Sequence, residues 1–164
     1  MVAGRRERWL EAAASIRLAI AFDPWNAEFK EVFADMQSKV HQVRAAELLE
    51  RADASWDASA QQEALRLYEE ALHYRPCDAS ANHRAAQLSL DLGENEKARE
   101  YAENACELEP EAAEYQVTLG RALRASGMRE KARQALDAAL RLDPGSQQAR
   151  AEHEALRRNS RRRR

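Results

Sequence analysis

The side chains that are able to bind a metal or act as a nucleophile are few and lie far apart in this sequence. A structural zinc site needs about four cysteine or histidine ligands at short, regular spacings. The candidates here are His41, His73, His83, His153, Cys77 and Cys106. Because these six residues show no such spacing, we expect neither a metal site nor a cofactor.

Catalysis also finds little support in the sequence. A catalytic site combines a nucleophile or an acid–base group with a partner in a dry cleft, whereas the carboxylates here follow the pattern of solvated helix surfaces. No glycine-rich loop offers backbone amides to a phosphate group. We therefore predict that the protein is not an enzyme.

Arginine is the residue type that shows the clearest potential for binding. Six arginines crowd the segment 157–164, and the rest of the chain then has 20 basic and 28 acidic residues, a net charge of −8. They are Arg157, Arg158, Arg161, Arg162, Arg163 and Arg164. Clustered guanidinium groups bind phosphates in a salt-dependent way, so one hypothesis is a basic tail that binds nucleic acid or an anionic surface. The alternative is a solvated tail, or one that folds back on the acidic body.

The composition indicates which elements position these groups. The chain has 164 residues, of which 33% are charged, and only five glycines and four prolines, too few for a sheet fold with many turns. Two cysteines do not make a disulfide framework, and Glu11 and Arg17 interrupt the only apolar stretch near the start. We expect an all-α protein without a transmembrane segment, located in the cytoplasm.

Prolines recur with a period of 34 residues. The separations are 110 − 76 = 34 and 144 − 110 = 34. Alanines keep the same period at Ala64, Ala98 and Ala132, and at Ala71, Ala105 and Ala139. Small residues let two helices approach closely, and proline ends the second of them. Each period is therefore predicted to be a helical hairpin.

With these residues the sequence resembles the tetratricopeptide repeat family, whose 34-residue consensus is Trp-x2-Leu-Gly-x2-Tyr, then Ala-x3-Phe, Ala and Pro. The copy over 113–146 matches best, 79–112 has two alanines in place of Leu-Gly, and 45–78 has Arg51 and Ser55 at apolar consensus positions. The best copy carries Leu119, Gly120, Leu123, Gly127, Ala132, Leu136, Ala139 and Pro144. The resemblance implies a superhelix of antiparallel helix hairpins.

The remaining proline predicts an unusual start. Pro24 lies 52 residues before Pro76, and the excess of 52 − 34 = 18 residues equals five helical turns. An insertion of that length keeps the helix faces in register, so we predict one long helix over 26–55; the alternative is two helices with a break near Ser38. Residues 5–24 then form an incomplete repeat that lacks its first helix.

The missing partner helix has a consequence for the face of residues 7–22. Ala12, Ile16 and Ala19 are expected to be uncovered unless another chain or an upstream segment packs there. Self-association through this face is therefore a second alternative function, and a mis-assigned start of the chain is the other explanation. Behind Pro144 we expect a capping helix over 147–156, which completes a single repeat domain over 1–156.

The resemblance also implies a concave groove that is lined by one face of each first helix. Its lining is expected at Leu49, Asp53, Trp56, His83, Gln87, Leu90, Val117, Arg121, Arg124 and Arg158. Arg121 and Arg124 are expected to hold a carboxylate of an acidic peptide by bidentate bonds.

Some members of the family bind acidic chaperone C-termini through Lys and Asn in one repeat and Lys and Arg in another. The corresponding residues here are Leu49, Asp53, Glu114 and Thr118, or one repeat later His83, Gln87, Gln148 and Glu152. Neither set matches, which argues against that mode of binding.

The predicted function is a non-enzymatic protein–protein interaction module that binds a peptide or helix as an adaptor, scaffold or co-chaperone-like subunit. The order of an interrupted repeat, a long helix and phased repeats is also similar to the C-terminal part of some bacterial J-domain co-chaperone-like proteins. The His-Pro-Asp tripeptide of the J-domain is absent from this sequence.

Overall fold

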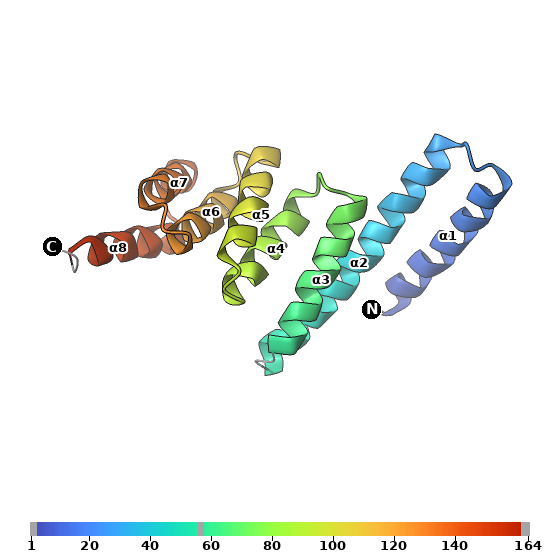
Figure 1. Cartoon of the computed structure of the whole chain (residues 1–164), viewed down its shortest axis with the longest axis horizontal. Coiled ribbons are helices and arrows are strands. Elements are labelled where there is room, and N and C mark those ends of the chain that lie inside the picture. Colours follow the sequence, from blue (N-terminus) through green and yellow to red (C-terminus); the bar gives the residue numbers. More distant parts are fainter. Residues whose placement is uncertain (1–2, 56–57, 162–164) are drawn as a thin grey trace. The chain divides into compact units, whose positions relative to one another are not determined.

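Helices are the only regular secondary structure in the part of the chain that the structure describes. The computed structural model describes the backbone of residues 3–55 and 58–161, and the side chains of these ranges except 3–10, 13, 48–55, 58, 74 and 159–161. Within this part there are eight helices and no strand (Figure 1). They are α1 (Ala3–Phe22), α2 (Ala27–Ser55), α3 (Ala58–Tyr74), α4 (Ala79–Asp91), α5 (Asn95–Leu108), α6 (Ala113–Ala125), α7 (Arg129–Leu142) and α8 (Gln147–Arg161). The predicted all-α class is confirmed.

The helices form two compact units, residues 1–76 and 77–164, where the sequence predicts a single repeat domain. The boundary falls between Pro76 and Cys77, at the end of the repeat predicted over 45–78. None of the described helices combines the length and the apolar character that crossing a bilayer requires.

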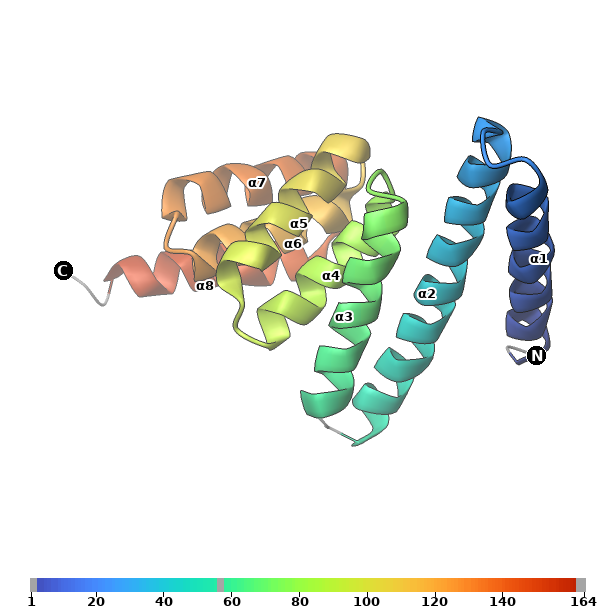
Figure 2. The same ribbon diagram turned by 45° about the vertical axis from the view of Figure 1, so that its right-hand side comes forward.

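In the first unit α2 packs along α3 on one side and contacts α1 on the other (Figure 2). The predicted long helix near the N-terminus is confirmed, because α2 continues without a break through Ser38. Asn26 caps it, since its side-chain oxygen accepts a hydrogen bond from the backbone N–H of Phe29 at 3.2 Å. An ion pair joins Asp35 of α2 to Arg75, the residue that follows α3.

The exposed apolar surface of this unit differs from the expected one. Ala12, Ile16 and Ala19 are half-buried because α1 packs against α2. Among the described side chains of this unit, the most exposed large apolar ones lie at the end of α1 and in the following turn. They are Leu18 at 66%, Phe22 at 91% and Trp25 at 91% of full exposure.

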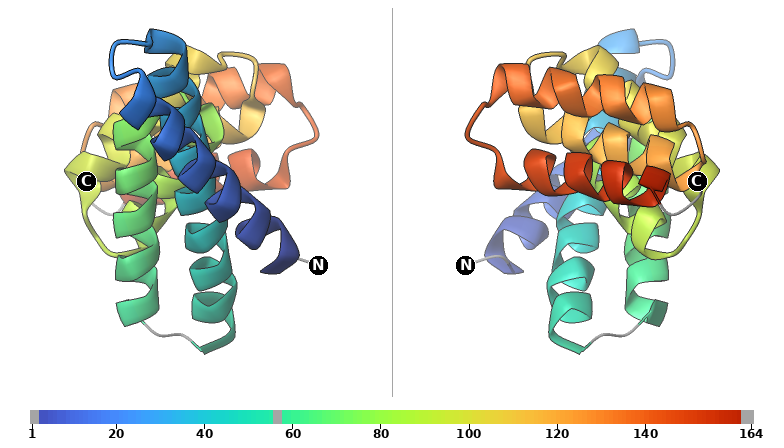
Figure 3. Two further views of the ribbon diagram at one scale, coloured as in Figure 1. Left: turned by 90° about the vertical axis from the view of Figure 1, so that its right-hand side faces the viewer. Right: turned by 90° about the vertical axis from the view of Figure 1, so that its left-hand side faces the viewer.

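The second unit consists of the hairpins α4–α5 and α6–α7 followed by α8, which packs on both α6 and α7 (Figure 3). Its core uses the phased alanines where helices cross, with larger side chains between them. One cluster joins α6, α7 and α8 through Val117, Leu136, Ala149 and Leu156. Helix α8 continues past Leu156, where the capping helix was expected to end, to Arg161.

Glycines shape the two hairpins of this unit in two ways. Gly93 and Gly127 have φ angles of 76° and 78°, a conformation that other residues adopt at a cost, and they make the tight turns between paired helices. Gly120 serves close packing instead. A Cβ atom at this position would lie 2.6 Å from the Cγ of Leu136, so α6 and α7 approach each other only because that atom is missing.

Candidate binding site on helices α4, α6 and α8

Two arginines on one face of α6 hold a carboxylate from α8. Arg121 and Arg124 lie one helical turn apart, so their side chains share a face. The Nε of Arg121 is 3.7 Å from one carboxylate oxygen of Glu152, and an Nη of Arg124 is 3.0 Å from the other. The three side chains are 27%, 36% and 19% exposed, respectively, so solvent reaches the cluster.

The geometry of this cluster leaves binding capacity unused. The Nε of Arg124 is buried and has no hydrogen-bond partner. An arginine that holds a carboxylate in the bidentate way uses two of its N–H groups. The cluster is therefore a carboxylate site that is filled, with imperfect geometry, by a residue of the same chain.

Sequence reasoning considered Glu152 only as a mismatch to the chaperone-binding residues and missed this role. A signal was present: Glu152 stands 34 residues after Thr118, at the same position of the period. In the structure the carboxylate at this position of α8 contacts the two arginines of α6.

On α4 the expected groove residue His83 is part of the polar core. It is 7% exposed, and its Nε2 lies 2.9 Å from the hydroxyl oxygen of Thr118. That hydroxyl donates to the carbonyl of Glu114, so the Nε2 of His83 is the donor to it. The imidazole ring also packs on Tyr115 with 4.5 Å between ring centroids.

Burial lowers the pKa of His83 below its ordinary value, because the charged form loses its hydration. The carboxylate of Glu114 opposes this shift, and the positive charges of Arg84 and Arg121 add to it. A neutral, hydrogen-bonded imidazole packs α4 against α6 and offers no contact surface to a partner. The prediction that His83 lines the groove is therefore wrong.

Val117, which the sequence predicts in the groove lining, lies in the core instead. It is 2% exposed and belongs to the core cluster with Leu136, because its side chain faces α7 and α8. On α4, Gln87 and Leu90 remain partly accessible. Gln87 accepts a hydrogen bond from Arg84 at 3.1 Å, and Leu90 packs beside the small core of Ala86 and its neighbours.

The other predicted site residues either lie away from the cluster of Arg121, Arg124 and Glu152 or have side chains that the structure does not describe. Leu49, Asp53 and Trp56 lie outside the residues whose side chains are described, as do Arg161, Arg162, Arg163 and Arg164 of the tail. Arg158 is 81% exposed and pairs with Glu154 at 3.2 Å, one turn back on α8. Arg157 is exposed on the same helix. The expected groove residue Arg158 thus lies on the solvated side of α8.

The two thiols lie in different environments, and neither belongs to a group of metal-binding side chains among the described residues. No group of three metal-binding side chains occurs among the residues that the structure describes. Cys106 is buried, and burial raises the pKa of its thiol to about 12, so it stays protonated at neutral pH. Cys77 is exposed.

The comparisons with known proteins agree with this architecture. Models of the tetratricopeptide repeat match residues 79–111 and 113–146. These ranges coincide with two of the three predicted repeats, and the repeat at 45–78 stays a prediction. No curated protein matches the sequence.

Solved structures show the same fold at low sequence identity. The second repeat domain of human RPAP3, in complex with the HSP70 peptide SGPTIEEVD, is 19% identical with a TM-score of 0.67, covering 76% of this chain and 98% of that one. The first repeat domain of Spaghetti (RPAP3), bound to the HSP90 peptide SRMEEVD, is 16% identical with a TM-score of 0.67, covering 76% and 94%. The MamA RS-1 ArsTM double mutant is 18% identical with a TM-score of 0.69, covering 97% and 83%.

The period of 34 residues, the paired helices and these matches lead to one conclusion. Residues 79–111 and 113–146 match the tetratricopeptide repeat, and the described helices have the fold of solved tetratricopeptide repeat domains.

Proposed function

We propose that this protein is a non-enzymatic interaction module that binds an acidic segment of a partner protein through Arg121 and Arg124, as an adaptor or scaffold. The observation that carries the proposal is the contact of both arginines with the carboxylate of Glu152. Arginine recognises carboxylates better than other side chains do because its planar N–H groups match the two oxygens. A partner carboxylate replaces that of Glu152.

Replacement of Glu152 costs little free energy. The three side chains are partly exposed, and exposed ion pairs contribute about 0–1 kcal/mol to stability. The partner also supplies an acceptor to the unused Nε of Arg124. The small cost of losing the Glu152 ion pair and the new hydrogen bond to Arg124 together favour replacement of Glu152 by a partner carboxylate.

The structural neighbours supply a second argument for an acidic partner. Two of them are bound to chaperone peptides that end in Glu-Glu-Val-Asp. The family's usual clamp residues do not occur here, and His83, at one of the clamp positions, is buried. We therefore propose that α6 recognises the carboxylate. A co-chaperone-like role would require that the C-terminus of a chaperone binds to Arg121 and Arg124.

The test is a titration of the full chain with a fluorescein-labelled peptide ending in Glu-Glu-Val-Asp, monitored by fluorescence anisotropy. Arg121→Ala with Arg124→Ala should weaken binding by about tenfold or more, because charged hydrogen bonds contribute about 1.5–3 kcal/mol each. The matched control is Lys131→Ala with Arg141→Ala, which removes two exposed positive charges from α7.

Glu152→Gln gives an independent readout. It removes the internal competitor and should raise the affinity for the same peptide. A peptide with glutamine and asparagine in place of its acidic residues should not bind. Equal weakening by the two double variants, together with no gain from Glu152→Gln, would contradict the proposal.

A further inference from the structure

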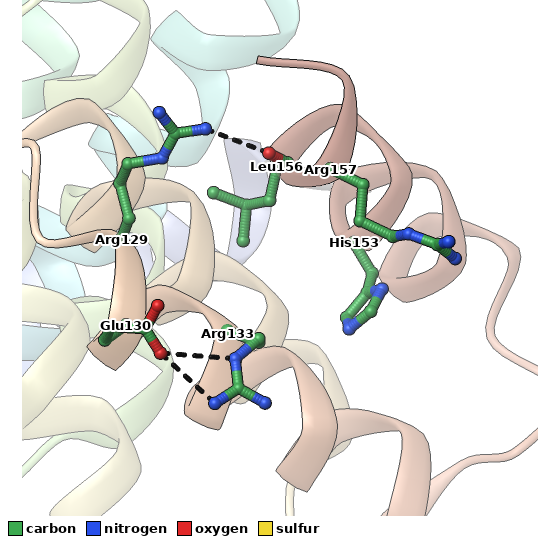
Figure 4. Close-up of a pocket in the computed structure, with 6 residues that line it drawn as sticks. All are labelled: Arg129, Glu130, Arg133, His153, Leu156 and Arg157. Atoms are coloured by element: carbon green, nitrogen blue, oxygen red, sulfur yellow. Dashed lines mark hydrogen bonds and ion pairs between the residues drawn. The ribbon is translucent and has the colours of Figure 1, made fainter. Parts of the chain in front are cut away.

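Helices α7 and α8 enclose a small hollow on the second unit that the proposed site does not include. Its volume is about 120 Å³, enough for one side chain but not for a drug-sized ligand. It is lined by Arg129, Glu130, Arg133, His153, Leu156 and Arg157 (Figure 4). Three arginines from two helices thus surround one cavity.

The apolar part of the hollow is the side chain of Leu156. It lies between the guanidinium group of Arg129 and the pair formed by Glu130 and Arg133 (Figure 4). Leu156 is 8% exposed and belongs to the core cluster of α6, α7 and α8. The hollow therefore has an apolar floor that belongs to the core, with charged groups around it.

The charge of Arg129 is not matched by a carboxylate. Its Nη2 donates a hydrogen bond to the backbone carbonyl of Leu156 at 3.0 Å, a neutral acceptor. Arg129 forms no ion pair with any carboxylate among the described residues. Arg133, by contrast, donates to Glu130 on its own helix at 3.1 Å.

The balance of charge around the hollow favours an anion with one negative charge. The lining carries three arginines against Glu130, and a second carboxylate, Asp137, lies 3.2 Å from His153 and 3.5 Å from Arg133. One carboxylate neutralises this excess of one positive charge, whereas a phosphate group with nearly two negative charges overcompensates it. The methylene groups of an acidic side chain match the apolar floor.

The geometry points to a second binding site for acidic residues: the α7–α8 hollow takes the side-chain carboxylate of an Asp or Glu presented by a partner protein. The ligand carboxylate contacts the guanidinium groups of Arg129 and Arg133, and its aliphatic stem rests on Leu156. The hollow is distinct from the Arg121–Arg124 site, which lies between α6 and α8. With both sites, the second unit holds an acidic segment at two points.

The test uses the full chain and an amidated ten-residue peptide of alternating glutamate and glycine, labelled with fluorescein. It is done in the Arg121→Ala, Arg124→Ala background, so that binding at the proposed site does not contribute. Arg129→Ala and Arg133→Ala should each weaken binding by about fivefold to tenfold. Lys131→Ala is the matched control on the same helix and should change binding by less than about twofold.

Arg129→Ala removes a contact between α7 and α8 and could therefore disturb folding. Arg133→Ala is the safer variant, because Arg133 is 54% exposed and its ion pairs with Glu130 and Asp137 lie within α7. Amide chemical shifts in the NMR spectrum should change in α7 and α8 when the peptide is added. Equal effects of Arg129→Ala, Arg133→Ala and Lys131→Ala, or shift changes confined to α6, would overturn this site.

A peptide with phosphoserine in place of glutamate tests the class of anion. Tighter binding of that peptide would overturn the assignment to carboxylates. The same measurements also test the two sites independently of each other. Loss of binding only in the Arg121 and Arg124 variants overturns the hollow and leaves the proposed function intact, while loss only in the Arg129 and Arg133 variants does the reverse.

Discussion

At Gly120 the backbone of α6 lies directly against α7. The absent Cβ would lie 2.6 Å from the Cγ and 2.7 Å from the Cδ2 of Leu136, which is fully buried and has no room to move. The resemblance to the repeat consensus identifies this glycine from sequence, since it expects Leu-Gly here. Its physical reason, the contact with one particular leucine, comes from the structure.

Gly120→Ala should therefore lower the free energy of unfolding. Overpacking of a well-packed core costs about 1–3 kcal/mol, which exceeds the gain in helix propensity of about 0.5–1 kcal/mol. Urea unfolding monitored by circular dichroism measures the change. Gly145→Ala is the control, because its new Cβ would meet only the exposed Asp143 side chain; a similar loss in both variants would contradict the packing argument.

His83 predicts a dependence of stability on pH. Burial keeps its pKa in the folded protein below the unfolded value of 6.5, so the unfolded chain takes up the proton first as the pH falls. The free energy of unfolding should be unaffected by His83 above about pH 6.5 and should decrease below it. The decrease ends once the pH lies below the folded-state pKa.

The measurement compares urea unfolding at pH 7.5 and 5.5 for the native sequence and for His83→Gln. Glutamine keeps a donor for Thr118 but does not titrate, so the variant should lose less stability between the two pH values. The other histidines are present in both proteins and cancel in the comparison. An identical loss in both would show that His83 does not contribute.

The helices show which parts of the structure the sequence determines locally. The 34-residue period locates the helices of both hairpins, and the absence of glycine and proline between Pro24 and Pro76 predicts the continuous α2. The exposure of Val117 and His83 was not predictable from the same pattern. It depends on which neighbouring helix covers each face of α4 and α6, and α8 buries positions that a groove would leave open.

The starts of the helices differ in a way that unfolding measurements detect. The side chain of Asp78 accepts a hydrogen bond from the N–H of Ala81 at 2.9 Å and caps α4, whereas Ala112, at the same place before α6, has no side-chain cap. Asp78→Ala should lower the free energy of unfolding by about 1 kcal/mol, and Ala112→Ser should raise it. Chemical denaturation of both variants measures the two effects. Changes of the same sign would contradict the assignment of these caps.

For the whole molecule, the division at Pro76 indicates that the second unit has a complete core of its own. Its clusters are built from α4 to α8, and each predicted binding site that the structure describes lies there. The charge within this unit is also uneven. Residues 77–116 have ten acidic and three basic residues, and 117–164 have five acidic and thirteen basic. An acidic partner is thus attracted to one end of the unit.

The fragment 77–164 should therefore fold alone. We expect it to be helical by circular dichroism and to unfold cooperatively on heating, because the contacts that bury its alanines and leucines are internal to it. The fragment 1–76 is the comparison. A broad, non-cooperative transition of 77–164 would show that its core needs the first unit.

Self-association through residues 7–22, nucleic-acid binding by the tail and the resemblance to J-domain co-chaperone-like proteins stay predictions. In the first unit, residue counts alone predicted the long helix α2. They did not predict the exposed Leu18, Phe22 and Trp25, because the path of the turn after α1 decides their exposure.

The exposure of Trp25 makes it a natural fluorescence probe of the first unit. Its indole is 91% exposed, with the ammonium group of Lys30 lying 5.9 Å from the ring centre. With Trp9→Phe and Trp56→Phe, emission comes from Trp25 alone and should be quenched efficiently by acrylamide. Any molecule that covers this turn will shift the emission to shorter wavelength and slow the quenching. The fluorescence of Trp25 therefore detects a ligand of this surface directly.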